Sequence, residues 1–197
     1  MNARGYTLLE AMVAVAILGI LSMIAAPSFT AWVNRSQVGT MAESIQSGLD
    51  QARMEAVKRN RPVTFTLSDQ DLPSCDDPGA STSGTNWIIC VMEDAADSAA
   101  IPDPIVGGKS GSAAVTVNAG FSAINFDGMG RANSGDMVEI EICKGPEEKS
   151  EHRRRRILLT SSGSVSSCDP TLQANKHGAC KDNSPSNSNS KKPRSCS

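Results

Sequence analysis

An apolar segment near the N-terminus constrains the fold more than any other part of this chain. It runs almost unbroken from Ala11 to Ala26 and ends before Pro27. Counted from Tyr6, the 21 residues to Ala26 would form a helix about 31 Å long, enough to cross the hydrocarbon core of a bilayer. The segment has no polar face, so it does not suit a helix in a soluble core, and we expect a transmembrane helix over residues 6–26.

Glu10 is the one charge inside this span. A carboxylate at the centre of a membrane helix costs roughly 2.5 to 3.5 kcal/mol on insertion scales, so such residues usually have a partner and a function. A cut after Gly5 would make Tyr6 a free amino terminus and place Glu10 in the first helical turn, where the helix dipole favours an acid. The alternative is an ordinary secretory signal, but Glu10 interrupts its apolar part, and its small-residue site at Ala26 directly precedes Pro27.

A short basic leader, the motif Gly5-Tyr6-Thr7-Leu8-Leu9-Glu10 and the apolar helix follow one another directly. Together they resemble the class III signal of type IV pilins and type II secretion pseudopilins. The resemblance implies that a prepilin peptidase removes leader 1–5 by cutting between Gly5 and Tyr6, and that Tyr6 is then N-methylated. It also implies that Glu10 docks the subunit into a growing fibre. Tyr6 stands where the family mostly has phenylalanine, but it keeps the aromatic ring.

Residues 27–60 predict an amphipathic continuation of the helix. Apolar side chains recur there at three- and four-residue steps. They are Phe29, Trp32, Val33, Met41, Ile45, Leu49, Ala52 and Ala56. The helix should end near Asn60, because the residue before Pro62 disfavours helical geometry. We therefore expect a helix of about fifty residues, whose first part lies in a membrane and whose second part packs against a globular domain. A free coiled coil is the alternative, but this stripe of apolar residues is short and rich in alanine.

Beyond Pro62 the pattern changes to strands. The expected strands cover residues 63–67, 87–92, 114–117, 123–126, 137–143 and 157–160, with a further one near Val165. Segments 68–86 and 94–112 are rich in Gly, Ser, Asp and Pro and are expected to be connections. One long helix followed by such strands predicts an α+β fold, in which a pilin-like N-terminal helix packs on an antiparallel β-sheet domain.

Three further motifs carry a narrower resemblance: Glu55–Phe65 at the helix end, Phe126-Asp127-Gly128-Met129-Gly130-Arg131, and Arg155-Arg156-Ile157. They are similar to motifs of GspH/FimT-type minor pilins, and with the leader the resemblance covers residues 1 to about 168. It implies a β-rich domain over 62–168, followed by a Ser/Asn/Lys-rich tail over 169–197.

For function, this resemblance implies a minor pilin in a low-abundance complex that primes assembly of a type IV pilus and sits near its tip. The implied partners are other minor and major pilins, the prepilin peptidase and the bacterial inner membrane. The C-terminal domain would be periplasmic before the chain enters the pilus. A DNA-binding minor pilin for natural transformation and a type II secretion minor pseudopilin are the alternatives.

Charge is divided unevenly along the chain. Residues 1–143 carry 8 basic and 16 acidic side chains, whereas residues 144–197 carry 11 basic and 5 acidic ones. The candidate contacts to DNA or another anion are Arg153, Arg154, Arg155 and Arg156 in the domain and Lys191, Lys192 and Arg194 in the tail. The alternative, which we favour, is a solvated and partly ion-paired entry to the strand expected from residue 157, because acidic residues at 147, 148 and 151 precede the run and arginines in an extended segment alternate between faces.

Two observations count against DNA. Some FimT-type pilins resemble DNA receptors through a Gly-Arg-x-Arg motif near the last strand. The matching place here is Gly163-Ser164-Val165-Ser166, which lacks both arginines. The tail also contains no aromatic residue on which bases could stack.

Six cysteines at wide spacings predict disulfides formed in an oxidising compartment. They are Cys75, Cys90, Cys143, Cys168, Cys180 and Cys196. There is no C-x-x-C pair and the two histidines are far apart, so we expect no metal. Six cysteines allow 15 complete pairings, and the sequential one is our expectation: 75 with 90, 143 with 168, and 180 with 196. The last bridge would tie down a tail that its composition otherwise predicts to be mobile.

The sequence contains no constellation typical of an enzyme, and we expect neither catalysis nor a cofactor. Ser161-Ser162-Gly163-Ser164 has no histidine placed as a base. Gly107-Gly108-Lys109-Ser110 lacks the upstream glycine and the following helix of a phosphate-binding loop, so it is expected to be a glycine-rich loop.

Overall fold

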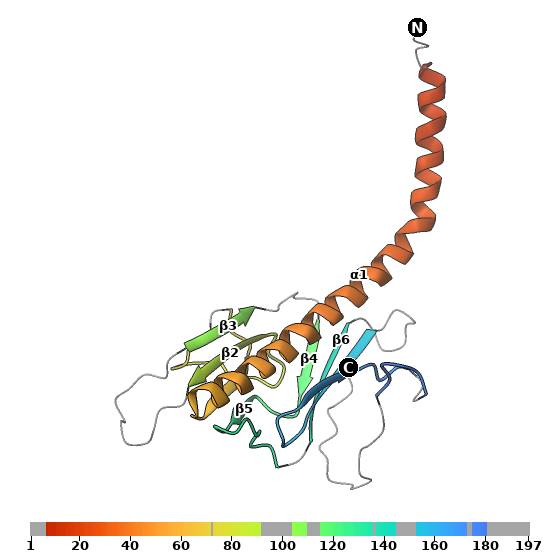
Figure 1. Ribbon diagram of the computed structural model, residues 1–197. Coiled ribbons are helices and arrows are strands. Elements are labelled where there is room, and N and C mark those ends of the chain that lie inside the picture. Colours follow the sequence, from red (N-terminus) through yellow and green to blue (C-terminus); the bar gives the residue numbers. More distant parts are fainter. Residues whose placement is uncertain are drawn as a thin grey trace, which may run out of the picture.

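The protein consists of one long helix and two antiparallel sheets in a computed structural model (Figure 1). The structure describes residues 7–71, 73–91, 104–109, 115–135, 137–144, 153–172 and 175–180. This arrangement confirms the α+β fold expected from the sequence, a long N-terminal helix packed on a β-domain.

Helix α1 (Leu8–Arg59) contains 52 residues. Thr7 caps its first turn, because the Thr7 hydroxyl accepts a hydrogen bond from the N–H of Glu10 at 3.3 Å. At the other end Asn60 adopts a left-handed conformation with φ 51°, and its N–H donates to carbonyls of the last turn. The predicted helix of about fifty residues and its end near Asn60 are confirmed.

Pro27 ends the apolar run but not the helix, because α1 continues through it. Proline has no N–H to donate to the carbonyl four residues earlier, and this loss commonly bends a helix. Figure 1 shows such a bend: the first half of α1 extends away from the domain, and the second half lies along the sheets.

Two four-stranded antiparallel sheets lie against the second half of α1. The first has the spatial order β3-β2-β1-β5 and the second β4-β6-β7-β8. The first sheet contains β1 (Val63–Ser68), β2 (Asn86–Val91), β3 (Pro104–Lys109) and β5 (Ala123–Phe126). The second contains β4 (Thr116–Ala119), β6 (Val138–Lys144), β7 (Arg153–Leu159) and β8 (Val165–Cys168).

The expectation that residues 94–112 form a connection is wrong for β3. Pro104, Gly107 and Gly108 lower the strand preference of this segment, which is why the sequence pattern missed it. β3 lies at the edge of its sheet and pairs with β2, and an edge position tolerates proline and glycine. The expected loop over 107–110 is therefore a strand up to Lys109, while Ser110 lies outside the described residues.

The strand expected over 157–160 is the C-terminal part of β7, which already begins at Arg153. The arginine run therefore lies inside a strand rather than before one. Smaller differences concern β4, which begins two residues later than expected, and β6, which begins one residue later.

The core lies between α1 and the inner faces of both sheets. The buried stripe of α1 consists of Val38, Met41, Ala42, Ile45, Leu49, Ala52 and Ala56, so the predicted stripe from Met41 onward is confirmed. Gly48 allows a close approach to the first sheet, because a Cβ there would lie 2.8 Å from Cε2 of Phe65. Phe29 and Trp32 were expected to continue the stripe, but they are 64% and 65% exposed because α1 has not yet reached the sheets at that level (Figure 1).

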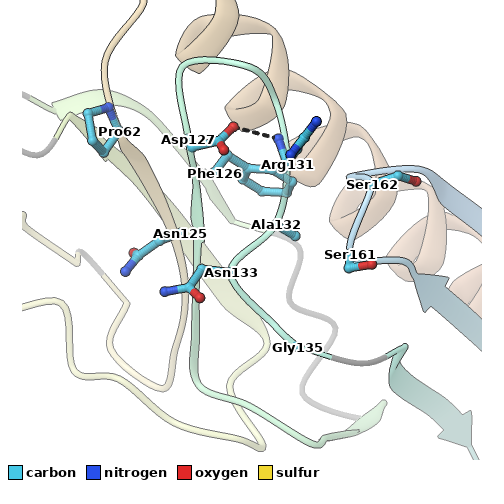
Figure 2. Close-up of a pocket in the computed structure, with 10 residues that line it drawn as sticks. All are labelled: Pro62, Asn125, Phe126, Asp127, Arg131, Ala132, Asn133, Gly135, Ser161 and Ser162. Atoms are coloured by element: carbon cyan, nitrogen blue, oxygen red, sulfur yellow. Dashed lines mark hydrogen bonds between the residues drawn. The ribbon is translucent and has the colours of Figure 1, made fainter.

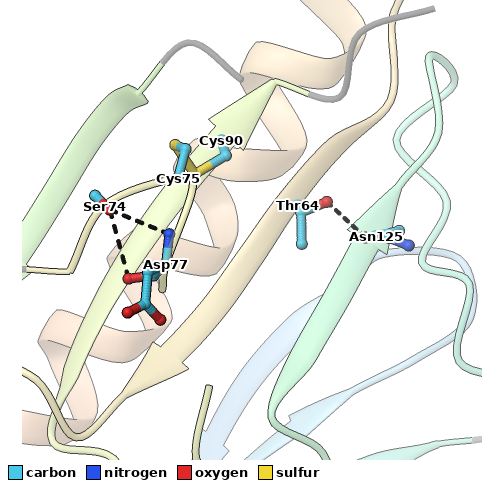
Figure 3. Close-up of a disulfide and its surroundings, with 6 residues drawn as sticks. All are labelled: Thr64, Ser74, Cys75, Asp77, Cys90 and Asn125. Atoms are coloured by element: carbon cyan, nitrogen blue, oxygen red, sulfur yellow. Dashed lines mark hydrogen bonds between the residues drawn. A yellow bond between two sulfur atoms is a disulfide. The ribbon is translucent and has the colours of Figure 1, made fainter. Parts of the chain in front are cut away.

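Cys75 and Cys90 form the expected disulfide, which ties the segment after β1 to β2 (Figure 3). Cys168 pairs with Cys180, so the expected bridges 143–168 and 180–196 are both wrong. Cys143 is also disulfide-bonded, and Cys196 lies outside the described residues.

The chain after β8 explains the corrected pairing. Asp169 and Ala179 form a parallel bridge, and the N–H of Asp169 donates to the carbonyl of Gly178 at 2.8 Å. These contacts return the chain to the end of β8 and bring Cys180 beside Cys168. The expected mobile tail therefore does not begin at Asp169, and residues 181–197 lie outside the described part.

Candidate assembly helix and basic surfaces

The first half of α1 presents an exposed apolar surface outside the globular domain (Figure 1). Its exposed large apolar residues up to Met23 are Leu8, Leu9, Met12, Val13, Val15, Ile17, Leu18, Ile20, Leu21 and Met23, each more than half exposed. A continuous apolar patch of this kind marks a surface that binds a membrane or another protein. It is the first candidate site in the described part of the chain.

Glu10 lies in the first turn of this helix, as the sequence predicts for a chain cut after Gly5. Its side chain is exposed, and among the described residues no cation pairs with its carboxylate. The acid suits the positive end of the helix dipole. Gly5 and Tyr6, the predicted cleavage and methylation residues, lie outside the described residues.

The predicted transmembrane helix over residues 6–26 receives no support from the structure. Within the described ranges, no helix is long and apolar enough to cross a membrane.

A short segment joins the exposed half of α1 to the domain. The rings of Phe29 and Trp32 lie side by side with their centroids 6.0 Å apart, and Arg35 is exposed one turn later. The ammonium group of Lys144, at the end of β6, then donates a hydrogen bond to Oε1 of Gln37. The C-terminal end of β6 is thereby fixed beside α1 where the helix enters the domain.

The arginine run is divided between two faces of β7. Arg154 lies 3.4 Å from a carboxylate oxygen of Glu141, and Arg156 lies 3.7 Å from one of Glu139, so both pair with acids of β6 on the face away from the core. Arg155 pairs in register with Ile142, whose side chain is in the core, and therefore belongs to the face toward α1.

Ion pairing of this run was expected, but with acids that precede it in sequence. Glu147, Glu148 and Glu151 lie outside the described residues, and the partners found are Glu139 and Glu141 of the neighbouring strand. The other candidate anion contacts also lie outside: Lys191, Lys192, Arg194 and the side chain of Arg153.

The motif Phe126–Arg131 forms a tight loop beside the C-terminal end of α1 (Figure 2). Oδ1 of Asp127 accepts hydrogen bonds from the N–H groups of Met129, at 2.9 Å, and Arg131, at 2.8 Å. Gly130 is buried in a left-handed conformation with φ 76°, and a Cβ there would lie 2.9 Å from Cγ2 of Val57 on α1. The motif therefore closes the loop against the end of the helix.

An open cavity of about 840 Å³ lies beside this loop, between it and the turn that joins β7 to β8 (Figure 2). Its polar lining includes Asn125, Asn133, Ser161 and Ser162, none of which the sequence singled out as a site. The N–H of Ala132 donates to the carbonyl of Ser161 at 3.0 Å, so one wall is held to the other. Within the described residues no group of His, Cys, Asp or Glu is arranged to hold a metal.

Two acids on the second half of α1 have shifted pKa values. Burial raises the pKa of the Asp50 carboxyl, and the nearby Arg53 charge only partly opposes this. Hydrogen bonds from Arg59, at 2.9 Å, and Lys58, at 3.2 Å, lower the pKa of Glu55. These basic residues lie in the last turn, where they also suit the helix dipole.

Comparison with known protein families decides what kind of chain this is. Residues 41–163 match the family described as type II transport protein GspH, and residues 1–26 match the prokaryotic N-terminal methylation motif. The chain belongs to the GspH family. It is a type IV pilin-like protein of the GspH/FimT type, as the leader and the β-domain motifs predicted.

Two similar curated proteins are type IV pilins by their descriptions. This GspH-family chain is 32% identical over 95 residues to the type IV narrow pilus major component PilA5 of Thermus thermophilus, covering 44% of this chain and 71% of that protein. It is 31% identical over 87 residues to the type IV major alpha-pilin of Moraxella bovis, covering 44% of this chain and 53% of that protein. It thus spans about half the length of the Moraxella pilin.

Among solved structures, the type IV minor pilin FimU of Pseudomonas aeruginosa matches with a TM-score of 0.50 and 20% identity. The match covers 68% of this chain and 90% of FimU, and it shows a shared α+β fold. As a pilin-like protein with an N-terminal methylation motif, this GspH-family chain is of a kind that is anchored in a membrane and associates with other pilins.

Proposed function

We propose that this chain is a minor pilin of a type IV pilus, that it belongs to the complex that primes pilus assembly, and that it sits near the pilus tip. The observation that carries the proposal is the exposed apolar half of α1, with Glu10 in its first turn. Removing apolar surface of this extent from water is favourable, and either a bilayer or the helices of other subunits can cover it.

Processing prepares this helix for docking. A prepilin peptidase cuts between Gly5 and Tyr6, and Tyr6 is N-methylated. The new terminal ammonium of one subunit and the Glu10 carboxylate of its neighbour then attract each other. Two such charges about 4 Å apart interact by about 4 kcal/mol at an effective dielectric constant of about 20, before desolvation is subtracted. This attraction sets the axial register between the helices of neighbouring subunits.

Two stages of location follow from the proposal. Before assembly, residues 6–26 hold the chain in the bacterial inner membrane with the domain in the periplasm, where its disulfides can form. After assembly, the same helix lies among the helices of other minor and major pilins, and the domain is at the surface of the pilus. Neither stage involves catalysis or a cofactor.

Glu10→Ala tests the docking role. We expect normal processing of the variant but at least a tenfold lower amount in the sheared pilus fraction, as expected from the loss of about 1.4 kcal/mol or more. Glu43→Ala is the matched control, because Glu43 is an exposed acid on the same helix, beside the domain. Equal incorporation of the Glu10 and Glu43 variants would refute the docking role.

A type II secretion minor pseudopilin is the second candidate, and the description of the matching family favours it. An exposed apolar helix would serve subunit docking equally in a pilus and in a type II secretion system, so a deletion phenotype must distinguish the two roles. Deletion of the gene should abolish surface pili and leave secretion of extracellular enzymes intact. Loss of secretion with normal pili would assign the chain to the secretion system instead.

A DNA-binding pilin for natural transformation is the other alternative. The pairing of Arg154 and Arg156 with acids of β6 leaves fewer free cations on β7 than the sequence indicates. A mobility shift of the full chain in detergent with duplex DNA over a salt series tests this role. DNA binding that weakens with salt and is lost on replacing Arg153 and Arg155 would support it.

A further inference from the structure

Arg35, Lys144 and Arg155 gather where α1 leaves the domain, and the strand position of Arg153 adjoins them; we call these four residues the basic neck. The hydrogen bond from Lys144 to Gln37 places the end of β6 beside α1, two residues after Arg35. Arg153 is the register partner of Lys144 on β7, and Arg155 follows on the same face of the strand. Arg35 precedes the buried Val38 by three residues and therefore lies on the side of the helix that faces the domain.

Three of the four basic-neck side chains lie in the described part of the chain, and none of these three is neutralised there. No acidic side chain there pairs with Arg35, Lys144 or Arg155, in contrast to Arg154 and Arg156 on the opposite face. Residues 145–152 lie outside the described residues and contain three glutamates. Arg154 and Arg156 are left out of the count because they pair with Glu141 and Glu139. Residues 144–156 then carry four basic and three acidic side chains, and with Arg35 the net charge is +2.

The basic neck follows directly after the apolar half of α1. Gln37 comes five residues after Trp32, a distance of about 7.5 Å along the helix. The exposed rings of Phe29 and Trp32 lie between the apolar residues and the basic ones. Aromatic rings are enriched at the boundary between lipid and water, and basic residues just beyond a membrane segment attract anionic headgroups within about 10 Å.

We propose that the basic neck binds the phosphate headgroups of anionic phospholipids and holds the domain against the membrane before the chain enters a fibre. The inference rests on the proposed function, because it requires the exposed half of α1 to be in a bilayer. It adds a second contact, of the domain with the membrane surface, that must be released when the subunit is drawn into the complex.

Lipid headgroups are the source of phosphate that this arrangement favours. DNA has the same phosphate chemistry, but a duplex keeps its bases stacked inside and has no apolar surface that could cover the exposed apolar residues adjoining the cations. Lys144 and Gln37 also hold the cations at the end of the domain from which the apolar helix emerges, which is the end nearest an enclosing bilayer (Figure 1).

The test uses the full chain in vesicles with dansyl-labelled headgroups, composed of phosphatidylcholine alone or with added phosphatidylglycerol. Trp32 is exposed and Trp87 is buried in the domain, so in Trp32→Phe the remaining tryptophan reports the distance from the domain to the membrane by energy transfer. The energy transfer measured with the unaltered chain, minus that measured with Trp32→Phe, is the signal of Trp32 and reports insertion of the helix into the bilayer. Both readings are taken at low and high salt.

The charge variant is Arg35→Gln with Lys144→Gln, and Arg35→Gln alone is a milder version at an exposed position. The matched control, Lys58→Gln with Arg131→Gln, removes the same charge at the far end of the domain. Lys58 is 21 residues beyond Gln37 on α1, about 31 Å away.

We expect transfer from Trp87 to rise on addition of phosphatidylglycerol, to fall at high salt, and to be retained in the control. In the charge variant the equilibrium constant for domain contact should fall about 30-fold at low salt, since each cation near an anionic surface contributes a factor of about five. Equal transfer in both lipid mixtures, or an equal loss in the control, would overturn the inference while leaving the proposed function standing.

Absence of any shift in the Trp32 signal would instead mean that the helix does not enter the bilayer, and the proposed function would fail with the inference. Binding of duplex DNA that depends on the same cations, without any effect of anionic lipid, would reassign the basic neck to nucleic acid.

Discussion

Gly163 is the position where a single methyl group should have the largest effect on the fold. It lies in the turn between β7 and β8, is buried, and has φ 79°. A Cβ at this position would lie 2.0 Å from the carbonyl oxygen of Gly130, where the turn crosses the Phe126–Arg131 loop. The substitution Gly163→Ala therefore imposes both backbone strain and a collision between two backbones.

The two contributions can be estimated separately. A left-handed conformation costs a non-glycine residue about 1 to 2 kcal/mol. To relieve the collision, the turn must move by about 1 Å away from the loop, which strains the hydrogen bond of 3.0 Å from the Ala132 N–H to the Ser161 carbonyl. Overpacking of this kind costs about 1 to 3 kcal/mol. We expect Gly163→Ala to lower the free energy of unfolding by about 2 to 5 kcal/mol.

Gly178→Ala isolates the backbone contribution. Gly178 has φ 84°, but nothing lies within 4 Å of a Cβ built there. It should cost only the strain of about 1 to 2 kcal/mol. Guanidinium unfolding of the full chain in detergent, followed by near-ultraviolet circular dichroism with the disulfides intact, measures both values. Equal destabilisation by the two substitutions would refute the claim that the turn and the loop are in close contact.

Three further predictions concern charge and disulfides. Asp50→Asn should raise the free energy of unfolding at neutral pH, because burial disfavours the charged carboxylate and so raises the pKa of Asp50. The gain should shrink as the pH falls through this raised pKa, where Asp50 becomes neutral in the folded chain. Unfolding measured over a pH series checks this. Non-reducing peptide mapping should link Cys168 to Cys180, and replacing both with serine should cost about 3 kcal/mol in a thermal or chemical unfolding experiment. Arg154→Met should cost about 3 kcal/mol because it removes the cation from Glu141, which is 2% exposed, and adding Glu141→Gln should recover most of the loss in a double-mutant cycle.

The helix was the most predictable part of the fold, because its pattern is local. The three- and four-residue steps identified the side chains that α1 buries from Met41 to Ala56, and Pro62 indicated the end. Phe29 and Trp32 fit the same period but are exposed. A period shows which face a residue occupies, whereas burial depends on whether another element lies opposite, and only the structure shows where the sheets begin.

The partners of the arginine run were missed for a related reason. With a strand expected to begin at residue 157, the arginines formed only its entry, and no partner strand was assigned to them. The acids closest in sequence were therefore the expected partners. Because β7 begins at Arg153, the register with β6 places Glu139 and Glu141 on the face of Arg154 and Arg156. The alternation of acids with Ile140 and Ile142 in β6 was visible in the sequence, but the register was not.

The motif Phe126–Arg131 and the cysteines show the limit of sequence patterns. Resemblance drew attention to the motif, but its geometry depends on contacts with Val57 and Gly163, which are distant in sequence. In the same way the expected pairing of Cys168 with Cys143 was wrong, because the return of the chain after β8, which brings Cys180 beside Cys168, depends on the bridge between Asp169 and Ala179.

The N-terminus of the mature protein tests the central claim most directly. Mass spectrometry of the chain purified from its native membrane should show a first residue of N-methylated Tyr6, and Gly5→Val should leave an uncut precursor. A chain that keeps Met1, is cut after Ala26, or is processed normally when Gly5 is replaced would contradict the account.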